Sequence, residues 1–368
     1  MTTWLQTLAA PLVSTLQHPL VDNIVRLSAV EDTLKALHPL LSLTQVRARV
    51  SRIVDETPDT KTFVLQPNAL WAGFQAGQYV RISLEINGRQ VHRLYSLSGR
   101  PGARKLAITV KRQAAGLVSA HLHEHTRVGD VLTLSQADGD FVLPGALPQA
   151  WPDKLLLLSA GSGITPVMAM LRELQARHYQ GDVVFLHVCR EPQALTFAHT
   201  LQRMAADMPN LRLVTHFTQD SGRLTAEQLQ AAVPDLGQRS TWVCGPQGLM
   251  DAVHALWRDQ GFAAPLASER FTAAPLLHAS APDAPVTVTL GKSGTTFMTA
   301  GADPLLVQAE NAGLSPKHGC RIGICRSCQC TKKSGTVENL QTGEISSTPD
   351  EPIRLCISVA RSDLALDL

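Results

Sequence analysis

Cys320-Arg-Ile-Gly-Ile-Cys325-Arg-Ser-Cys328 places three cysteines in nine residues, and Cys356 follows after a gap of 27 residues. Three thiolates from one loop and a fourth from a remote segment can converge on a single metal centre. Gly319 and Gly323 give such a loop the backbone freedom to wrap an inorganic core. Five of the seven cysteines lie between positions 320 and 356, whereas a disulfide framework would scatter them along a short secreted chain. The pattern therefore predicts a metal site.

The spacing also indicates which metal centre is bound. A C-x4-C-x2-C run with one remote cysteine is the arrangement of plant-type 2Fe–2S clusters, so we predict that Cys320, Cys325, Cys328 and Cys356 are the ligands. Structural zinc is the alternative, because Cys325 and Cys328 alone could form half of a zinc site. Cys330 is a fifth thiol nearby, but Cys328 completes the pattern.

Length and composition limit the remaining possibilities. At 368 residues the chain can form two or three domains, each with its own core. Its formal net charge of +2 lacks the electrostatic signature of nucleic-acid binding. No apolar run reaches the roughly 18 residues of a membrane-spanning helix, and segment 1–20 lacks the basic start of a signal peptide. We therefore expect a monomeric, cytoplasmic protein that binds no nucleic acid.

The N-terminal part of the chain changes character at Val46. Residues 1–45 predict an apolar helical extension, which either packs on the body of the protein or forms a docking surface for a partner or a membrane face. Residues 46–148 form short alternating runs separated by turns such as Asn87-Gly88, which predicts an antiparallel β-barrel.

The barrel segment contains two polar motifs. In Arg93-Leu-Tyr95-Ser96-Leu-Ser98, the arginine can pair with a pyrophosphate, the tyrosine can stack on a flat ring and a hydroxyl can reach a ring nitrogen. The alternative is an ordinary polar strand that binds no ligand. Gly116-Leu-Val-Ser119 opens a helical stretch whose first N–H groups favour phosphate. Both motifs are therefore candidate parts of one ligand site.

Residues 149–271 alternate strand-like and helical runs, which predicts an α/β domain with a parallel sheet. The apolar run Leu155–Leu158 leads into Gly161-Ser-Gly163-Ile-Thr165-Pro166 and a helix, the βα geometry that receives a dinucleotide pyrophosphate. Cys244-Gly245-Pro246 follows a later strand, so it should lie at the same edge of the sheet. Cys244 could equally be an inert core thiol.

The C-terminal part begins with an Ala/Pro-rich linker over residues 272–285, which should be semi-rigid. A hairpin around Gly291 and Gly294, a helix, the cysteine loop and late strands then predict an α+β ferredoxin-like module, a β-grasp domain, over residues 286–368.

Taken together, these motifs resemble those of the ferredoxin–NADP reductase superfamily, in its form with a C-terminal 2Fe–2S domain. The resemblance covers residues 46 to 368, and its motifs occur in the family's order. It implies FAD, a 2Fe–2S cluster and NADPH or NADH as cofactors. It also implies Ser96, near the reactive flavin nitrogen, and Cys244, beside the nicotinamide, as catalytic residues. The cofactor contacts that it implies are Arg93, Tyr95, Ser96, Ser98, Gly116, Ser119, Gly161, Gly163, Thr165, Gly245, Pro246, Glu269 and Phe271. One departure is that Ser98 stands before Gly99, the position at which the family often has a second hydroxyl.

The resemblance implies electron transfer from NAD(P)H through FAD and the cluster to an external oxygenase or desaturase. Arg190 and Arg223 could bind a 2′-phosphate, or could be solvated surface charges; we expect NADPH. The apolar extension favours a membrane fatty-acyl desaturase or hydroxylase as the acceptor, which would make the protein peripheral to the inner membrane through its partner. A Rieske-type ring-hydroxylating oxygenase is the alternative.

Two further hypotheses belong to other classes: a flavin and iron–sulfur redox sensor, and a flavin reductase with zinc in the cysteine loop. If the cluster is the point of electron exit, we expect a partner to contact Arg321, Ile322, Ile324 and Arg326, which flank the ligands.

Overall fold

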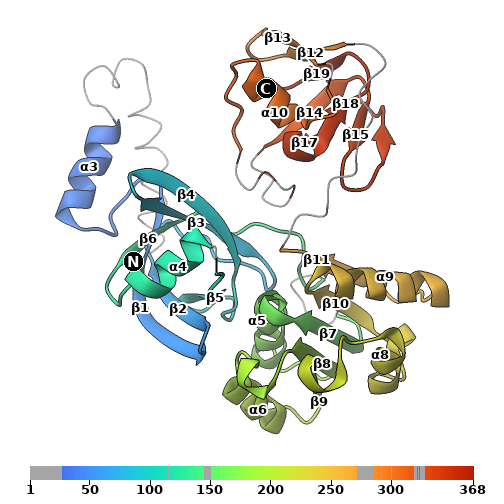
Figure 1. The fold of residues 1–368 in the computed structure, drawn as a ribbon. Helices are drawn as coiled ribbons and strands as arrows, with labels where there is room; N and C mark the ends of the chain where they lie inside the picture. The colour runs from blue at the N-terminus through green and yellow to red at the C-terminus, as the bar shows by residue number, and fades with distance from the viewer. Residues whose placement is uncertain are drawn as a thin grey trace. The chain divides into compact units, whose positions relative to one another are not determined.

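The computed structural model describes residues 27–114, 116–144, 151–271, 285–299, 301–318, 321, 323 and 328–368. The chain divides between Arg270 and Phe271 into two compact units (Figure 1). The first unit contains an antiparallel and a parallel sheet, and the second is rich in strands, so the predicted fold class is confirmed. Within the described residues, no helix has the length and apolar character needed to cross a membrane.

The antiparallel sheet is the predicted barrel. Its six strands follow the order β4-β3-β6-β1-β2-β5. The two edge strands meet through a bridge between Leu97, just after β4, and Ile108 of β5, which closes the sheet. The interior is apolar, and Phe63, Ile82 and Ile108 are completely buried. The elements are β1 (Val46–Thr57), β2 (Thr60–Pro67), β3 (Tyr79–Ile86), β4 (Arg89–Ser96), β5 (Leu106–Lys111), α4 (Leu117–His125) and β6 (Val131–Leu134).

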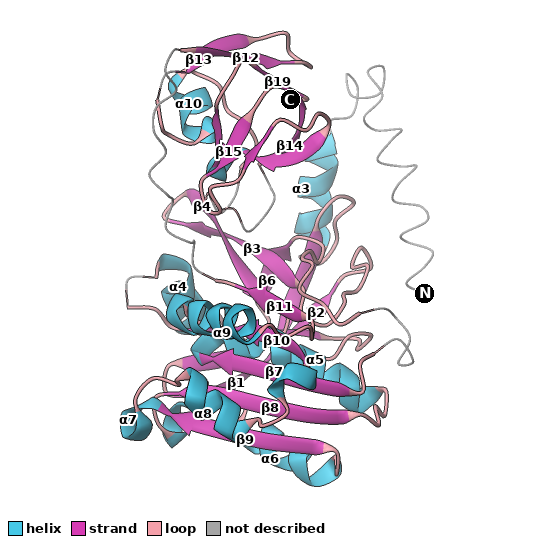
Figure 2. Cartoon of the chain, turned by 90° about the vertical axis from the view of Figure 1, so that its right-hand side faces the viewer, coloured by secondary structure: helices cyan, strands magenta, loops and turns pink. Residues whose placement is uncertain are grey.

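The parallel sheet follows the order β11-β10-β7-β8-β9 and carries helices on both faces (Figure 2). Residues Leu155–Leu158 of β7 are completely buried; the odd positions join the core with α5 and α6, and the even positions join the core with α9. An apolar run without alternation is therefore what a strand covered on both faces requires. The strands are β7 (Lys154–Ala160), β8 (Asp182–Cys189), β9 (Leu211–Phe217), β10 (Ser240–Cys244) and β11 (Leu266–Glu269). The helices are η2 (Gly161–Gly163), α5 (Ile164–Ala176), η3 (Pro192–Ala194), α6 (Ala198–Asp207), α7 (Thr218–Ser221), α8 (Ala226–Ala232), η4 (Leu236–Gln238) and α9 (Gln247–Gln260).

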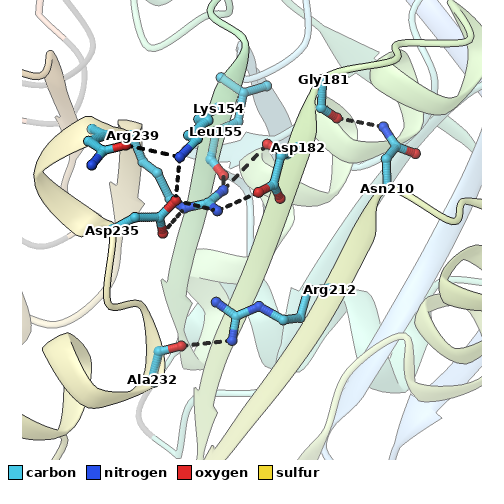
Figure 3. A network of polar contacts seen from close by, with 10 residues as sticks. Lys154, Leu155, Gly181, Asp182, Asn210, Arg212, Ala232, Asp235 and Arg239 are labelled. Atoms are coloured by element: carbon cyan, nitrogen blue, oxygen red, sulfur yellow. Dashed lines mark hydrogen bonds and ion pairs between the residues drawn. The ribbon is translucent and has the colours of Figure 1, made fainter.

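An ion network around the buried Arg239 ties the start of this sheet together (Figure 3). Arg239, only 3% exposed, forms ion pairs with Asp182 at 2.6 Å and with Asp235 at 2.7 Å. Lys154 adds a second cation 2.9 Å from Asp235. The hydrogen bond from Arg239 is the main reason that the pKa of Asp235 falls to about 2. Asp235 therefore stabilises the fold in its ionised form.

Replacing Arg239 with methionine should lower the free energy of unfolding at neutral pH by about 1–2 kcal/mol, because two partly exposed carboxylates, Asp182 and Asp235, lose their shared cation. The pKa of Asp235 is lowered in the folded state, so its stabilisation is complete above pH 3.8 and disappears as the pH falls through about 2. The difference between wild type and Arg239→Met should shrink across that range in urea unfolding curves. The control is Arg212→Met, an exposed arginine with one bond to the Ala232 carbonyl; an equal loss in both variants would contradict the prediction.

The second unit is built from two small sheets around one core. The larger sheet follows the order β13-β12-β19-β14-β17 and the smaller one β16-β15-β18. Helix α10 packs Leu305, Leu306 and Ala309 into the core, which also contains Cys328 and Cys356. The elements are β12 (Val286–Leu290), β13 (Thr296–Thr299), α10 (Leu305–Asn311), β14 (Gln329–Ser334), β15 (Val337–Asn339), β16 (Ile345–Ser346), β17 (Glu351–Arg354), η5 (Leu355–Ile357), β18 (Ser358–Ala360) and β19 (Leu364–Leu366).

The predicted N-terminal extension is described from residue 27 onward and contains α3 (Leu27–Leu37). Glu31 Oε1 accepts a hydrogen bond from the Leu43 N–H at 2.8 Å. Arg47 Nη1 of the barrel donates to the Pro39 carbonyl at 3.0 Å. The segment after α3 is therefore bound to the barrel. The predicted linker lies outside the described residues except for its last position, 285.

Candidate functional site

The predicted flavin motif lies at the end of β4, where the barrel closes. Ser96 is 5% exposed, Tyr95 is half-buried and Arg93 is exposed. Arg93 Nη1 donates to the His92 carbonyl at 2.7 Å, so the guanidinium stays near the strand surface. Burial raises the pKa of Tyr95, and the nearby Arg93 charge opposes that rise. The motif thus offers an accessible cation, a neutral phenol and a sheltered hydroxyl in sequence.

Ser98 behaves differently from its neighbours. It is completely buried, and its Oγ lies 2.8 Å from Thr109 Oγ1. Thr109 Oγ1 lies 2.8 Å from Thr62 Oγ1, which donates to Glu56 Oε1 at 2.7 Å. The Ser98 hydroxyl therefore has its partner inside the barrel, and the cofactor contact expected for Ser98 stays a prediction.

The predicted phosphate motif begins at α4, for which Gly116 is the N-cap residue. Ser119 Oγ donates to the Gly116 carbonyl at 3.1 Å and accepts the Gln113 N–H at 3.1 Å. A Cβ on Gly116 would lie 2.4 Å from Ser119 Oγ. Glycine is therefore required here so that the serine can fold back and shape the loop.

The predicted nucleotide turn is Gly161–Gly163, between β7 and α5. Gly161 has φ +54°, in the left-handed region, and Thr165 Oγ1 donates to the Ser162 carbonyl at 3.1 Å. A Cβ on Gly163 would lie 2.1 Å from the Cys244 carbonyl oxygen and 2.9 Å from the Gly245 nitrogen. Gly163 therefore allows the two predicted motifs to meet backbone to backbone at the carboxyl ends of adjacent strands.

Cys244 and Glu269 form the inner wall of this edge. They are register partners on β10 and β11. Cys244 is completely buried, and burial, followed by the neighbouring Glu269 charge, raises its thiol pKa. Burial raises the pKa of Glu269 to about 8. Although the Glu269 side chain is half-buried as a whole, its Oε2 is withdrawn from solvent and has no hydrogen-bond partner among the described residues.

The four remaining predicted residues lie at the surface, and one of them, Pro246, is the exposed N-cap residue of α9. Arg190 follows β8, and Arg223 follows α7, which comes after the neighbouring strand β9. The Gln219 N–H donates to the Arg190 carbonyl at 2.9 Å, which links these two loops. Both arginines are exposed, and Phe271 is 38% exposed. The two guanidinium groups are thus available to an anionic ligand.

The cysteine loop is described in part: Cys328 and Cys356 are buried, whereas Cys320 and Cys325 lie outside the described residues. The Gly323 N–H donates to Cys356 Sγ at 3.2 Å. Such a donor stabilises a thiolate that ligates a metal. Burial, and then the charge of Cys328, raises the pKa of Cys330 to about 12, which favours its neutral thiol.

Two arginines anchor this loop. Arg354 Nη1 donates to the Gly323 carbonyl. Arg321 binds Glu310 of α10 through both carboxylate oxygens, at 2.7 and 2.9 Å. Arg321 was expected to contact a partner protein, but in the structure its guanidinium is paired with Glu310 of the same unit. The other expected contact residues, Ile322, Ile324 and Arg326, lie outside the described residues.

The structure therefore brings several predicted residues together in two places. The first place is the sheet edge, which contains Gly163, Cys244, Gly245 and Glu269. Its Glu269 Oε2, which is unpaired among the described residues, and its side-chain-free glycines fit a bound nicotinamide and flavin. Gly323 and Cys356 fit a cluster through an N–H···S contact. Sequence reasoning missed Arg354, Glu310 and Arg172, an arginine of α5 that contacts the barrel. The opposite charges of Arg321 and Glu310 could have suggested that pair. Arg172 and Arg354 instead bind backbone carbonyls, for which the sequence contains no signal.

Comparison with known families gives three matches in this order along the chain. An oxidoreductase FAD-binding domain matches residues 47–142, an oxidoreductase NAD-binding domain matches residues 157–255, and a 2Fe-2S iron-sulfur cluster binding domain matches residues 288–361. The expected FAD, NAD(P)H and 2Fe–2S cofactors are thus confirmed at the level of domains. The zinc hypothesis has no such support.

Similar proteins are named as oxidoreductases or as reductase subunits of oxygenases. An NADPH oxidoreductase of Mycobacterium tuberculosis is 36% identical over 92% of this chain and 88% of its own length. A glycine betaine monooxygenase reductase subunit of Pseudomonas aeruginosa is 30% identical over 87% of this chain and 94% of its own length. The solved structure of phthalate dioxygenase reductase is 24% identical over 88% of this chain and 98% of its own length, with a TM-score of 0.58, and so shares the fold. These names support an oxidoreductase and leave the sensor hypothesis without support.

Proposed function

Because this chain belongs to the ferredoxin–NADP reductase superfamily, in its form with a C-terminal 2Fe–2S domain, we propose that it supplies electrons from NAD(P)H to the terminal oxygenase of a multicomponent system. The observation that carries this proposal is the close backbone approach of Gly163 to Cys244, beside the solvent-shielded Oε2 of Glu269, within a chain that also has a cluster-binding domain. When bound, the cofactors convert a two-electron hydride into single electrons. The residues of the chain bind and align them.

Each residue has a proposed task. Arg93 would neutralise the charge of the flavin pyrophosphate, which Gly116 and Ser119 would also contact. Tyr95 would pack on the flavin ring, and the Ser96 hydroxyl would form a hydrogen bond with a ring nitrogen. At the sheet edge, Thr165 orients the nucleotide, Cys244 excludes water from the nicotinamide, and Glu269 with Phe271 closes the flavin side. The proposed lining of the nucleotide site also includes Gly161, Gly163, Gly245 and Pro246. Cys320, Cys325, Cys328 and Cys356 hold the cluster.

An anaerobic titration tests this function. NAD(P)H should bleach the flavin absorbance and then produce the EPR signal of a reduced 2Fe–2S cluster, and the protein should reduce cytochrome c. Purified protein that contains flavin and iron but does not respond to either nucleotide would refute the proposal.

Glu269 gives this site a predicted pH dependence. The pKa of Glu269 in the folded protein, about 8, lies above the ordinary value of 4.5. Between pH 4.5 and pH 8, Glu269 is therefore protonated in the folded protein and ionised in the unfolded chain. Its contribution to stability is therefore complete below pH 4.5 and is lost as the pH rises through about 8. Thermal unfolding midpoints of wild type should fall relative to those of Glu269→Gln across that range. Parallel pH curves for the two proteins would contradict the raised pKa.

We further propose NADPH as the preferred donor. The support is that Arg190 and Arg223 are exposed on linked loops at the carboxyl edge of the sheet, where two guanidinium groups suit a 2′-phosphate. Steady-state kinetics test this choice: kcat/KM for NADPH should exceed that for NADH, and Arg223→Met should weaken NADPH use more than NADH use. A kcat/KM for NADH that equals or exceeds that for NADPH would overturn it.

For the acceptor, we propose a membrane-bound desaturase or hydroxylase within the wider oxygenase class. The support is α3 and the segment after it, where Leu37 is 73% and Leu41 40% exposed although the segment is bound to the barrel. Deleting residues 1–42 should slow electron transfer to such a partner while leaving ferricyanide reduction unchanged. Unchanged turnover with the true partner would favour the alternative, a Rieske-type ring-hydroxylating oxygenase.

A further inference from the structure

A polar contact joins α5 to the segment that directly follows β4. Arg172 lies seven residues after Thr165, about two helical turns, so both lie on the same face of α5. Its Nη1 donates a hydrogen bond to the backbone carbonyl of Ser98. Ser98 follows Ser96 by two positions. One helix thus begins at the nucleotide turn and makes contact next to the flavin motif.

The guanidinium of Arg172 is held in place by its surroundings. Its Cζ lies 5.1 Å from the centroid of the Phe197 ring, and the face of an aromatic ring attracts a cation. Phe197 is 1% exposed and has φ +63°, an uncommon backbone conformation for a non-glycine residue at the start of α6. Of the charged groups that face Arg172, Glu56 favours the cation and Arg203 disfavours it. The arginine is therefore fixed between the parallel sheet's helices and the barrel.

Ser98 is fixed from the barrel side as well. Its N–H donates to the Ala107 carbonyl at 2.9 Å, and its hydroxyl ends the chain of hydrogen bonds through Thr109 and Thr62 to Glu56. Each polar group of Ser98 thus has a partner, and one of these partners is Arg172. A shift of α5 relative to β4 would break the contact between charged guanidinium and carbonyl, which is stronger than a neutral hydrogen bond.

We propose that Arg172 is a positioning residue for hydride transfer, because it locks the helix of the nucleotide turn to the strand end that carries the flavin motif. This inference rests on the proposed function. Hydride transfer requires the reacting atoms to approach to about 3–3.5 Å, and a displacement of about 1 Å can cost about 100-fold in rate. A contact that fixes α5 against β4 acts directly on that distance.

Three variants of the full-length holoprotein test the proposal: Arg172→Met, Arg172→Lys and Arg203→Met. Arg203 lies on α6, near Arg172, and is exposed, so its replacement removes a neighbouring positive charge without touching the barrel contact. In anaerobic stopped-flow experiments, Arg172→Met should lower the limiting rate of flavin reduction about 10- to 100-fold. The dissociation constant of NAD(P)H should change less than about threefold, because the nucleotide turn itself is intact. Arg172→Lys, which keeps a donor and a charge, should recover part of the rate, and Arg203→Met should match wild type.

A second measurement does not depend on turnover. With the flavin removed, hydrogen exchange of the Leu97 and Ser98 amides should be faster in Arg172→Met than in wild type or Arg203→Met. A limiting rate for Arg172→Met equal to that of wild type would overturn the proposal, as would a loss confined to nucleotide affinity or shared by Arg203→Met. If wild type itself is not reduced by NAD(P)H, the proposed function fails instead, which separates the two conclusions.

Discussion

Replacing Cys356 with alanine should abolish one-electron delivery to cytochrome c while leaving NAD(P)H-dependent reduction of ferricyanide intact. Changes to groups that merely support a metal ligand commonly cost about 10- to 100-fold, so removing a ligand should cost at least that much. Cys356 is buried and accepts the Gly323 N–H. Its loss removes both a thiolate and the acceptor that orients the loop. Ferricyanide should be unaffected because it can take electrons directly from the flavin.

The matched control is Cys330→Ala, which makes the same change in a buried cysteine two positions after Cys328. Cys330 lies on β14 and outside the C-x4-C-x2-C spacing, so its variant should keep wild-type iron content, EPR signal and cytochrome c reduction. Iron and sulfide analysis of the two purified variants provides the measurement. The ligand assignment would be wrong if Cys356→Ala kept the cluster or if Cys330→Ala lost it.

The sequence predicted the sheet architecture where residue patterns follow directly from burial. Leu155–Leu158 is continuous because β7 is covered on both faces, and the glycine turn after it marks the start of α5. The barrel could be predicted from its alternating runs. Its closure through Leu97 and Ile108 could not, because that pairing depends on the curvature of the whole sheet.

The cysteine site was predicted from side-chain type and spacing, and the structure places Cys328 and Cys356 in one buried core, while their role as ligands stays a prediction. The site was less predictable where the fold determines which hydrogen-bond partner a side chain has. Ser98 has a hydroxyl beside a flavin motif, yet in the structure that hydroxyl points to Thr109 inside the barrel. Arg172 and Arg354 bind backbone carbonyls, which every residue possesses. No sequence pattern can reveal such a partner, and only the folded backbone brings it within reach.

Gly163→Ala should be the most damaging single change in the nucleotide domain. Its Cβ would lie 2.1 Å from the Cys244 carbonyl oxygen and 2.5 Å from the Cys244 carbonyl carbon. These are backbone atoms, so relief requires either the turn or the end of β10 to move. Such a shift separates the two motifs that meet at the sheet edge, and a displacement of about 1 Å should lower kcat/KM for NAD(P)H about 100-fold. Flavin content should be preserved, because the barrel is a separate sheet.

Gly248→Ala provides the matched control for this prediction. Gly248 lies in the first turn of α9, close in sequence to Cys244, and an added Cβ would meet nothing within 4 Å. Alanine also favours the helix, so this variant should match wild type in both kinetics and stability. Steady-state kinetics and nucleotide titrations of the two variants give the comparison. If Gly163→Ala retained the wild-type kcat/KM, the backbone contact between the turn and Cys244 could not be what holds the nucleotide site together. A comparable loss in Gly248→Ala would instead show that an added methyl group is damaging here without any contact to Cys244, and the specific importance of Gly163 would disappear.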